Sequence, residues 1–265
     1  MSEQTGSEDT VIRVRGLNKR FKDHVVHEGL DLDVRRGEII GIVGGSGTGK
    51  SVLLQQIVGL LKPDAGQIEV LGQSVRDTSD AEYRALRRRW GVMFQDGALF
   101  SSLTVRQNVE APMREQLEIS DALRETMAGI KVRMVGLPEN AHGKYPSELS
   151  GGMRKRAGFA RSIALDPEIV FLDEPTAGLD PIGAAAFDTL IRQLQTALGL
   201  TVFLVTHDLD SLHAICDRVA VLAEKKVLAV GTMEEMLEID HPWVKEYFQG
   251  PRARAAVGAA ASGLA

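Results

Sequence analysis

The strongest constraint on the fold of this chain is a glycine-rich loop between a short apolar run and a helical pattern. The apolar run is Ile39–Val43, and after the loop apolar residues recur at helical spacing from Ser51 to Leu61. A continuous apolar run of this length predicts a strand covered on both faces. The loop consists of Gly44, Gly45, Ser46, Gly47, Thr48, Gly49, Lys50 and Ser51. We therefore expect a strand, a loop and a helix in direct succession.

This loop matches the pattern G-x-x-x-x-G-K-[ST] at each of its fixed positions. Its glycines allow the backbone to curl so that successive N–H groups point at phosphate oxygens, and the following helix adds its positive N-terminal end. We expect the Lys50 ammonium to contact the β- and γ-phosphates of ATP and the Ser51 hydroxyl to coordinate Mg²⁺. A chance glycine–serine turn is the alternative, and the flanking strand and helix argue against it.

Two adjacent carboxylates follow a second apolar run. Asp173 and Glu174 come directly after Glu168–Leu172, which predicts a buried strand. In a sheet built around a phosphate loop this strand lies beside the loop, so Asp173 would reach Mg²⁺ directly or through water. Glu174 would then polarise the attacking water as general base. The alternative is that both acids cap the next loop, which is disfavoured beside a matched phosphate loop.

A second potential anion site lies at the start of another predicted helix. Ser150 suits an N-cap, and Gly151 and Gly152 would expose backbone N–H groups there. One nucleotide would need both this helix end and the phosphate loop, which a head-to-tail homodimer supplies from opposite chains. The Ser-Gly-Gly motif is weak in isolation and gains weight from its place among the other motifs.

The remaining pattern predicts an α/β fold that begins with an antiparallel β portion. Apolar and charged residues alternate in Val11–Val14 and Gly29–Val34, which predicts half-buried strands. A helical segment, Pro181–Leu198, lies between the buried runs Glu168–Leu172 and Thr201–Val205, which indicates a βαβ crossover. The other expected elements are a strand at Gln67–Val70, mostly helical segments at about 79–90 and 104–165 with Pro112, Pro138 and Pro146 as breaks, and a hairpin of Arg218–Leu222 and Lys226–Gly231.

Composition and charge exclude several classes of protein. The 265-residue chain has a net charge of -5, which gives no bulk attraction to nucleic acid. The basic run Arg84–Arg89 is either a solvated helix face or a local basic patch. Cys216 is the only cysteine, so no internal disulfide can form. We expect no signal peptide at the start, and no apolar run approaches the ~20 residues that span a bilayer, so a membrane role would come through partners.

In this order, the phosphate loop, the Ser150–Met153 motif and the carboxylate pair resemble the ATP-binding subunit of an ABC transporter. The resemblance covers nearly the whole chain. It implies the fold of a P-loop NTPase, an ABC-type nucleotide-binding domain with an antiparallel β subdomain and a helical subdomain at about 97–165. That ATPase domain would span 11–248, between a disordered N-terminus, 1–10, and a C-terminal tail, 249–265, that is also expected to be disordered.

The resemblance also implies roles for further residues. Phe21 would stack on adenine, Gln95 would join the Mg²⁺ site to the helical subdomain, and His207 would contact the γ-phosphate. Asp180 would act across the dimer together with the Ser150 motif. For Phe21 the alternative is a core aromatic, and for His207 a satisfied histidine at a strand end. The implied catalytic residues are Lys50, Gln95, Glu174 and His207, and the implied Mg²⁺ ligands are Ser51, Gln95 and Asp173.

Two short stretches resemble the ATPases of Mla/Mce-type lipid transporters: Met153, where most of the family has glutamine, and Gln95–Phe100. That resemblance implies permease subunits docked near Ala98–Ser102, an Mce-type lipid-binding subunit in the complex, and a place on the cytoplasmic face of a bacterial inner membrane. Interior packing is the alternative for Ala98–Phe100. For the function, the alternatives are an ABC ATPase of a soluble complex, for example in cluster assembly, and a transporter of another cargo.

An aromatic stretch, His241–Phe248, lies near the C-terminus. In similar subunits such an extension reaches the other protomer or a small accessory subunit. Folding back on its own domain is the alternative, and the sequence does not decide between them.

Overall fold

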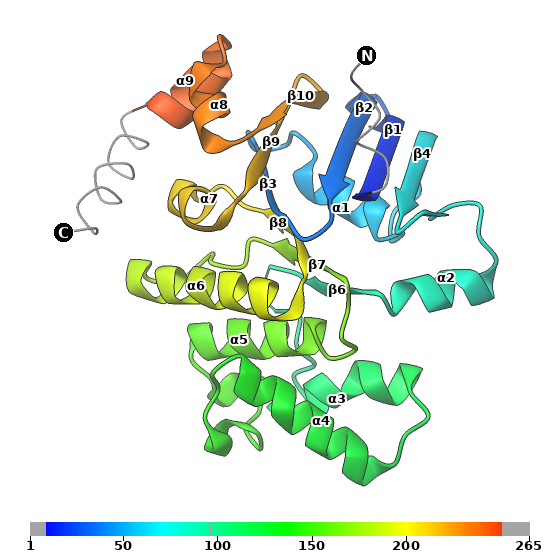
Figure 1. The fold of residues 1–265 in the computed structure, drawn as a ribbon, viewed down its shortest axis with the longest axis vertical. Helices are drawn as coiled ribbons and strands as arrows, with labels where there is room; N and C mark the ends of the chain where they lie inside the picture. Colours follow the sequence, from blue (N-terminus) through cyan, green and yellow to red (C-terminus); the bar gives the residue numbers. More distant parts are fainter. Residues whose placement is uncertain (1–8, 96, 251–265) are drawn as a thin grey trace. The chain divides into compact units, whose positions relative to one another are not determined.

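The computed structural model describes residues 9–95 and 97–250, which group into two compact units (Figure 1). The first unit combines residues 1–76 with 205–265, and the second is residues 77–204. Residues 1–8, Asp96 and 251–265 lie outside the described residues, and with them most of the two terminal segments predicted to be disordered. The predicted domain boundaries stay a prediction.

The first unit contains an antiparallel sheet in the order β2-β1-β4-β5. Its strands are β1 (Thr10–Phe21), β2 (His24–Arg35), β4 (Ala65–Val70) and β5 (Gln73–Ser74). Alternate residues such as Ile12 and Val14 of β1, and Leu32 and Val34 of β2, are buried, because one face of the sheet covers a core. The antiparallel β portion is therefore confirmed, with strands longer than the alternation indicated.

A second group of strands in this unit carries the glycine-rich loop. β3 (Ile39–Gly44) is buried at every position and pairs in parallel with β9 (Arg218–Ala223). β9 and β10 (Lys226–Gly231) form the predicted antiparallel hairpin. α1 (Lys50–Ile57) follows the loop, and the prediction that it continues to Leu61 is wrong. Gly59 adopts a left-handed conformation with φ 73°, which terminates a helix.

The described C-terminal part of the first unit consists of α7 (Leu209–Ile215), α8 (Met233–Glu238) and α9 (Pro242–Gln249). Val244 and Phe248 of α9 are buried in a cluster that includes Val43 of β3 and Val221 of β9. Cys216 is partly buried and packs against the same cluster. The aromatic stretch therefore folds back on its own unit.

The second unit contains the strands β6 (Trp90–Met93), β7 (Ile169–Asp173) and β8 (Thr201–Val205), which ends at the boundary between the units. β6 and β7 are parallel, and β8 lies next to β7. α6 (Pro181–Leu198) connects β7 to β8, as predicted. β6 was not predicted, because its short sequence Trp-Gly-Val-Met lacks alternation and follows directly on a helical pattern.

The helices of the second unit before β7 are α2 (Asp80–Arg87), α3 (Val105–Gln116), α4 (Asp121–Met134) and α5 (Gly151–Ser162), with 3₁₀ turns η1 (Glu139–Ala141) and η2 (Pro146–Glu148). Figure 1 shows α3, α4 and α5 packed together. Pro112 lies inside α3 and does not break it, because packing against α4 and α5 outweighs the loss of one backbone donor. The basic run Arg84–Arg89 is mostly exposed, as expected of a solvated face.

Among the described residues, no helix combines the length and the apolar character needed to cross a bilayer.

The packing of β6 against α5 gives a stability prediction. A Cβ on Gly91 would overlap the backbone carbonyl of Ser162, and a backbone cannot yield as a flexible side chain can. Gly91→Ala should therefore destabilise the protein by roughly 2–3 kcal/mol in urea unfolding. Gly143→Ala is the matched control, since its Cβ would enter open space, and it should change stability by less than about 0.5 kcal/mol. Equal unfolding midpoints for the two variants would contradict this packing.

Candidate functional site

The glycine-rich loop of the first unit turns between the end of β3 and the start of α1. Gly49 caps α1 with φ 94° and Gly47 has φ 80°, values that side chains rarely adopt. A Cβ on Gly44 would overlap the carbonyl oxygen of Leu222, and one on Gly49 would overlap Val26. Gly44 is therefore required for steric reasons, Gly47 for conformational reasons and Gly49 for both.

The interior of the loop is held by its own polar groups. Lys50 Nζ donates to the carbonyl oxygens of Gly44 at 2.8 Å and Gly45 at 3.2 Å. Thr48 donates to the Gly45 carbonyl through Oγ1 at 2.9 Å and through its backbone N–H at 3.3 Å. Ser51 is exposed in the first turn of α1. The loop thus folds around the Lys50 ammonium, which with the N-terminus of α1 makes a region suited to a polyphosphate.

A buried histidine contacts the loop on its protein-facing side, and no motif in the sequence points to it. His27 of β2 is 1% exposed, with Nδ1 3.1 Å from the Gln56 side-chain amide and Nε2 3.2 Å from the Gly49 carbonyl oxygen. A carbonyl can only accept, so Nε2 donates to Gly49. Burial lowers the pKa of His27, against the opposing effect of the hydrogen bonds to Gln56 and Gly49.

The inward position of His27 results from an irregular pairing of β1 with β2. The register shifts between the pairs Leu17↔Leu30 and Lys19↔His27. Gly29, between the two, has φ 64°. Such a bulge reverses the alternation of inward and outward side chains, so no signal in the sequence could place His27 in the core.

Phe21 and His207 occupy exposed positions in the first unit. Phe21, at the end of β1, is 45% exposed and lies beneath the Lys19 ammonium, which is 5.3 Å from the ring centroid. The core alternative for Phe21 is therefore wrong, and its ring is accessible for stacking. His207 follows Thr206, whose N–H donates to the Ile42 carbonyl at 3.3 Å. The His207 carbonyl accepts a hydrogen bond from the Tyr247 hydroxyl at 3.1 Å.

In the second unit, the carboxylate pair lies at the end of β7. Asp173 is the last residue of the strand, and Glu174 follows with φ 49°, a left-handed conformation that is strained for a residue with a side chain. The Glu174 carbonyl accepts from Lys155 Nζ at 3.1 Å and from the Ala177 N–H at 3.2 Å. These two bonds stabilise the unusual backbone.

Lys155 of α5 is a second residue near the site that no sequence motif indicates. It is only 5% exposed, and its ammonium donates to the carbonyl oxygens of both Gln95 and Glu174. A buried lysine needs such acceptors to offset its desolvation. It lies within the basic triplet Arg154–Arg156, whose pattern is typical of an exposed helix face. Only the packing therefore shows that Lys155 is buried and bonded to two carbonyl groups.

The predicted second anion site has the expected local geometry. Ser150 caps α5 and accepts from the Met153 N–H at 3.3 Å, with Gly151 and Gly152 in the first turn. Asp180 caps α6 and accepts from the Gly183 N–H at 2.9 Å. Ser150 and Asp180 are both exposed, so neither is part of an interior network.

The chemistry of the predicted Mg²⁺ ligands fits that ion. A hydroxyl, an amide oxygen and a carboxylate are hard oxygen donors of the kind Mg²⁺ prefers. Ser51 belongs to the first unit and Gln95 and Asp173 to the second, so the set stays a prediction. In the part of the chain that the structure describes, no group of three His, Cys, Asp or Glu side chains could hold a metal.

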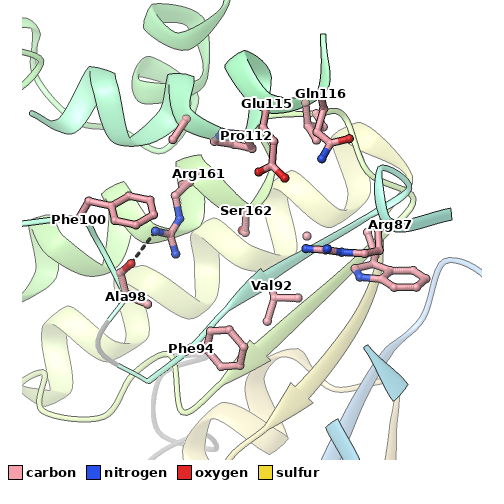
Figure 2. A pocket seen from close by; sticks show the side chains of 14 residues that line it. Arg87, Val92, Phe94, Ala98, Phe100, Pro112, Glu115, Gln116, Arg161 and Ser162 are labelled. Atoms are coloured by element: carbon pink, nitrogen blue, oxygen red, sulfur yellow. Dashed lines mark hydrogen bonds between the residues drawn. The ribbon is translucent and has the colours of Figure 1, made fainter. Parts of the chain in front are cut away.

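A cavity of about 430 Å³ lies between β6, α3 and α5 of the second unit (Figure 2). Arg161 of α5 donates to the carbonyl oxygens of Ala98 at 2.6 Å and Gly97 at 3.1 Å. Its guanidinium lies 5.8 Å from the ring centroid of Phe100, which is 55% exposed. Figure 2 shows both side chains at the cavity, from adjoining segments. Ala98 is exposed as well, so interior packing, the alternative for this stretch, is wrong for Ala98 and Phe100.

Asn108 fixes the loop that carries Phe100. Its Oδ1 accepts from the Phe100 N–H at 2.7 Å, and its Nδ2 donates to the carbonyl oxygens of Phe100 at 3.1 Å and Leu103 at 3.0 Å. Asn108 itself is fully buried. The exposed aromatic ring is therefore presented by an ordered backbone.

Comparison with known proteins gives matches to ATP-binding proteins of transport systems. A family model described as ABC transporter matches residues 27–177. The chain is 39% identical over 240 residues, 91% of its length and 90% of the relative's, to the intermembrane phospholipid transport system ATP-binding protein MlaF of Haemophilus influenzae. It is 38% identical over 241 residues, 91% of its length and 69% of the relative's, to the probable ribonucleotide transport ATP-binding protein mkl of Mycobacterium leprae.

Solved structures with the same fold include ATP-binding cassettes. A dimeric cassette in a post-hydrolysis state with ADP and Pi matches with a TM-score of 0.76 and 29% identity, over 83% of this chain and 98% of the other. The structure of cbiO1 from Clostridium perfringens, part of the ABC transporter complex cbiONQ, matches with a TM-score of 0.79 and 31% identity, over 95% and 100%.

The two acceptors of Lys155 give a prediction for the loop backbone. Lys155→Met keeps the aliphatic stem but removes the donor of two part-buried hydrogen bonds, so stability should fall by about 1–3 kcal/mol. The Ala177 amide, which shares the Glu174 carbonyl, should exchange hydrogen faster. Arg154→Met is the control, because Arg154 is an exposed neighbour on the same helix whose side chain donates to the Leu149 carbonyl rather than to Gln95 or Glu174. Unchanged Ala177 exchange in Lys155→Met would refute the stabilising role.

Proposed function

This chain belongs to the ABC transporter family as an ATP-binding ATPase, and we propose that it drives the transport of phospholipid or another hydrophobic cargo between membranes. The observation that carries the nucleotide-binding part of the proposal is the loop between β3 and α1, with Lys50 inside it and glycine required at Gly44 and Gly49. Such a loop at a helix N-terminus is built for the phosphates of a nucleotide.

Phosphate and adenine binding is proposed to use residues of the first unit, and Mg²⁺ binding residues of both units. Backbone N–H groups from Gly45 to Ser51 and the Lys50 ammonium bind the phosphates, and the exposed Phe21 ring stacks on adenine. Ser51, Gln95 and Asp173 would hold Mg²⁺, which neutralises charge on the phosphate oxygens when bound. Lys50 would exchange its loop carbonyl partners for phosphate oxygens when the nucleotide arrives.

Hydrolysis is proposed to depend on Glu174 and His207. Glu174 accepts a proton from the attacking water as general base, and its strained backbone, held by Lys155, fixes where the carboxylate points. His207 donates a hydrogen bond to a terminal phosphate oxygen. Gln95, with its exposed side chain and its carbonyl bonded to Lys155, would report the state of this site to the loop that carries Phe100.

A head-to-tail homodimer would complete each site. Ser150, Gly151, Gly152 and Asp180 form exposed or half-buried helix starts that would contact the ATP of the partner. Solved structures of similar cassettes are dimers, which supports this arrangement. ATP would close the pair, and loss of the γ-phosphate would reopen it.

The cavity beside Phe100 is the proposed docking site for permease subunits, at Ala98–Ser102. An exposed aromatic ring on an ordered loop, with an arginine against it, resembles the anchor of a protein interface. The phospholipid transporter relative is matched over 90% of its length and the ribonucleotide one over 69%, which favours lipid as cargo. We further propose that the complex contains an Mce-type lipid-binding subunit and that this chain lies at the cytoplasmic face of a bacterial inner membrane.

The proposed roles in binding and hydrolysis can be separated by two substitutions. Glu174→Gln should bind ATP with near-normal affinity but release phosphate at least about 100-fold more slowly, because the general base is lost. Lys50→Ala should instead weaken ATP binding by about 10-fold or more, because a charged hydrogen bond to the phosphates is lost. Equilibrium ATP binding and phosphate release measure the two effects. Normal turnover in Glu174→Gln would remove it as the base.

The docking proposal predicts the effect of a charge at the cavity. Tagged Phe100→Asp should lose co-purification with multi-span membrane subunits, while the ATPase activity of the isolated chain stays within about twofold. Leu123→Asp is the matched control, since Leu123 of α4 is also exposed, at 48%, and lies outside the cavity. Mass spectrometry of the complex would identify bound lipid. Recovery of a complex without any multi-span subunit would favour the soluble alternative.

A further inference from the structure

Helix α9 contacts both loops that would surround the terminal phosphate. Its buried face, Val244 and Phe248, fixes it on β3 and β9 through the cluster with Val43 and Val221. This anchoring sets the position of the remaining aromatic residues of the helix. Both contacts made by those residues lie within the first unit.

The first contact is with the phosphate loop. The indole Nε1 of Trp243 lies 3.7 Å from the position that a Cβ on Gly45 would occupy. Trp243 stacks on Tyr247, one helical turn later, with ring centroids 4.8 Å apart and planes within 14°. The indole is therefore held against the loop by a ring that is itself fixed.

The second contact is with His207. The Tyr247 hydroxyl donates to the His207 carbonyl at 3.1 Å. On its other side the segment is held by Thr206, whose N–H donates to Ile42, and whose Oγ1 accepts from the Asp208 N–H at 3.1 Å. The peptide of an exposed histidine is thus fixed between a strand end and a tyrosine.

We infer that α9 is a positioning element for hydrolysis, in which Tyr247 orients His207 and Trp243 supports the phosphate loop. The inference rests on the proposed function, because it needs His207 to contact the terminal phosphate. The stacked pair of Trp243 and Tyr247 then sets the distance between the phosphate loop and His207, which would both contact that phosphate. Small displacements of such groups reduce turnover more than substrate binding.

The orienting role of Tyr247 is tested by removing one oxygen atom. Tyr247→Phe keeps the stack on Trp243 and removes the bond to His207, so kcat for MgATP hydrolysis should fall about 3- to 10-fold, with KM changed less than twofold. Glu246→Gln is the matched control, because Glu246 is the exposed neighbour on the same helix. An unchanged kcat in Tyr247→Phe would overturn the inference.

A double-mutant cycle distinguishes positioning from a general effect on folding. In a His207→Ala background, Tyr247→Phe should lower kcat no further, because the imidazole that it orients is absent. An equal additional loss in that background would show a structural effect and would refute positioning. If His207→Ala itself keeps full activity, the proposed role of His207 fails. If His207→Ala loses activity while Tyr247→Phe does not, the inference about α9 fails alone.

Tryptophan fluorescence tests the contact with the phosphate loop. The chain has two tryptophans, and the other, Trp90, lies in the second unit. MgATP should change the emission of the Glu174→Gln protein, and Trp243→Phe should abolish most of that change while Glu246→Gln retains it. A change of equal size in the Trp243→Phe protein would assign the signal to Trp90 and contradict the support of the loop.

Discussion

The backbone turn between β3 and α1 is the constraint on which the first unit depends. Gly44 lies against the Leu222 carbonyl and Gly49 against Val26, so the turn exists only where no Cβ is present. The same close approach lets His27 donate to the Gly49 carbonyl from behind. The conformation of the loop therefore depends on the neighbouring strands as well as on its own glycines, because each strand occupies space that a side chain on the loop would need.

The second unit is organised around one face of α5. Lys155 holds the carbonyl oxygens of Gln95 and Glu174, and three residues later Gly158 packs directly on Gly97. Arg161, three residues further, holds the carbonyls of Gly97 and Ala98 and lies over Phe100. One helix therefore connects the loop at the cavity to the backbone of Glu174 through hydrogen bonds at its two ends.

Much of the architecture was predictable because it follows from local patterns. β8 and α6 have the predicted bounds, since a buried apolar run and a capped amphipathic segment leave few alternatives. β6 and the end of α1 were not predictable: the first is a short apolar segment that pairing with β7 makes a strand, and the second depends on the conformation of Gly59. Periodicity can be read from the local sequence. Strand pairing depends on the neighbouring strand, and helix termination depends on the backbone conformation that the fold imposes.

The sequence alone determined which segments are the candidates for the site, namely the glycine-rich loop, the carboxylate pair and the helix start at Ser150, because each motif is contiguous and its residue types have a direct chemical use. Only the tertiary structure decided that α9 folds back on its own unit and that His27, Lys155 and Tyr247 contact backbone groups of site residues. The physical reason is that these contacts join segments far apart in the chain, through a bulge, a buried charge and a helix orientation that no local pattern encodes.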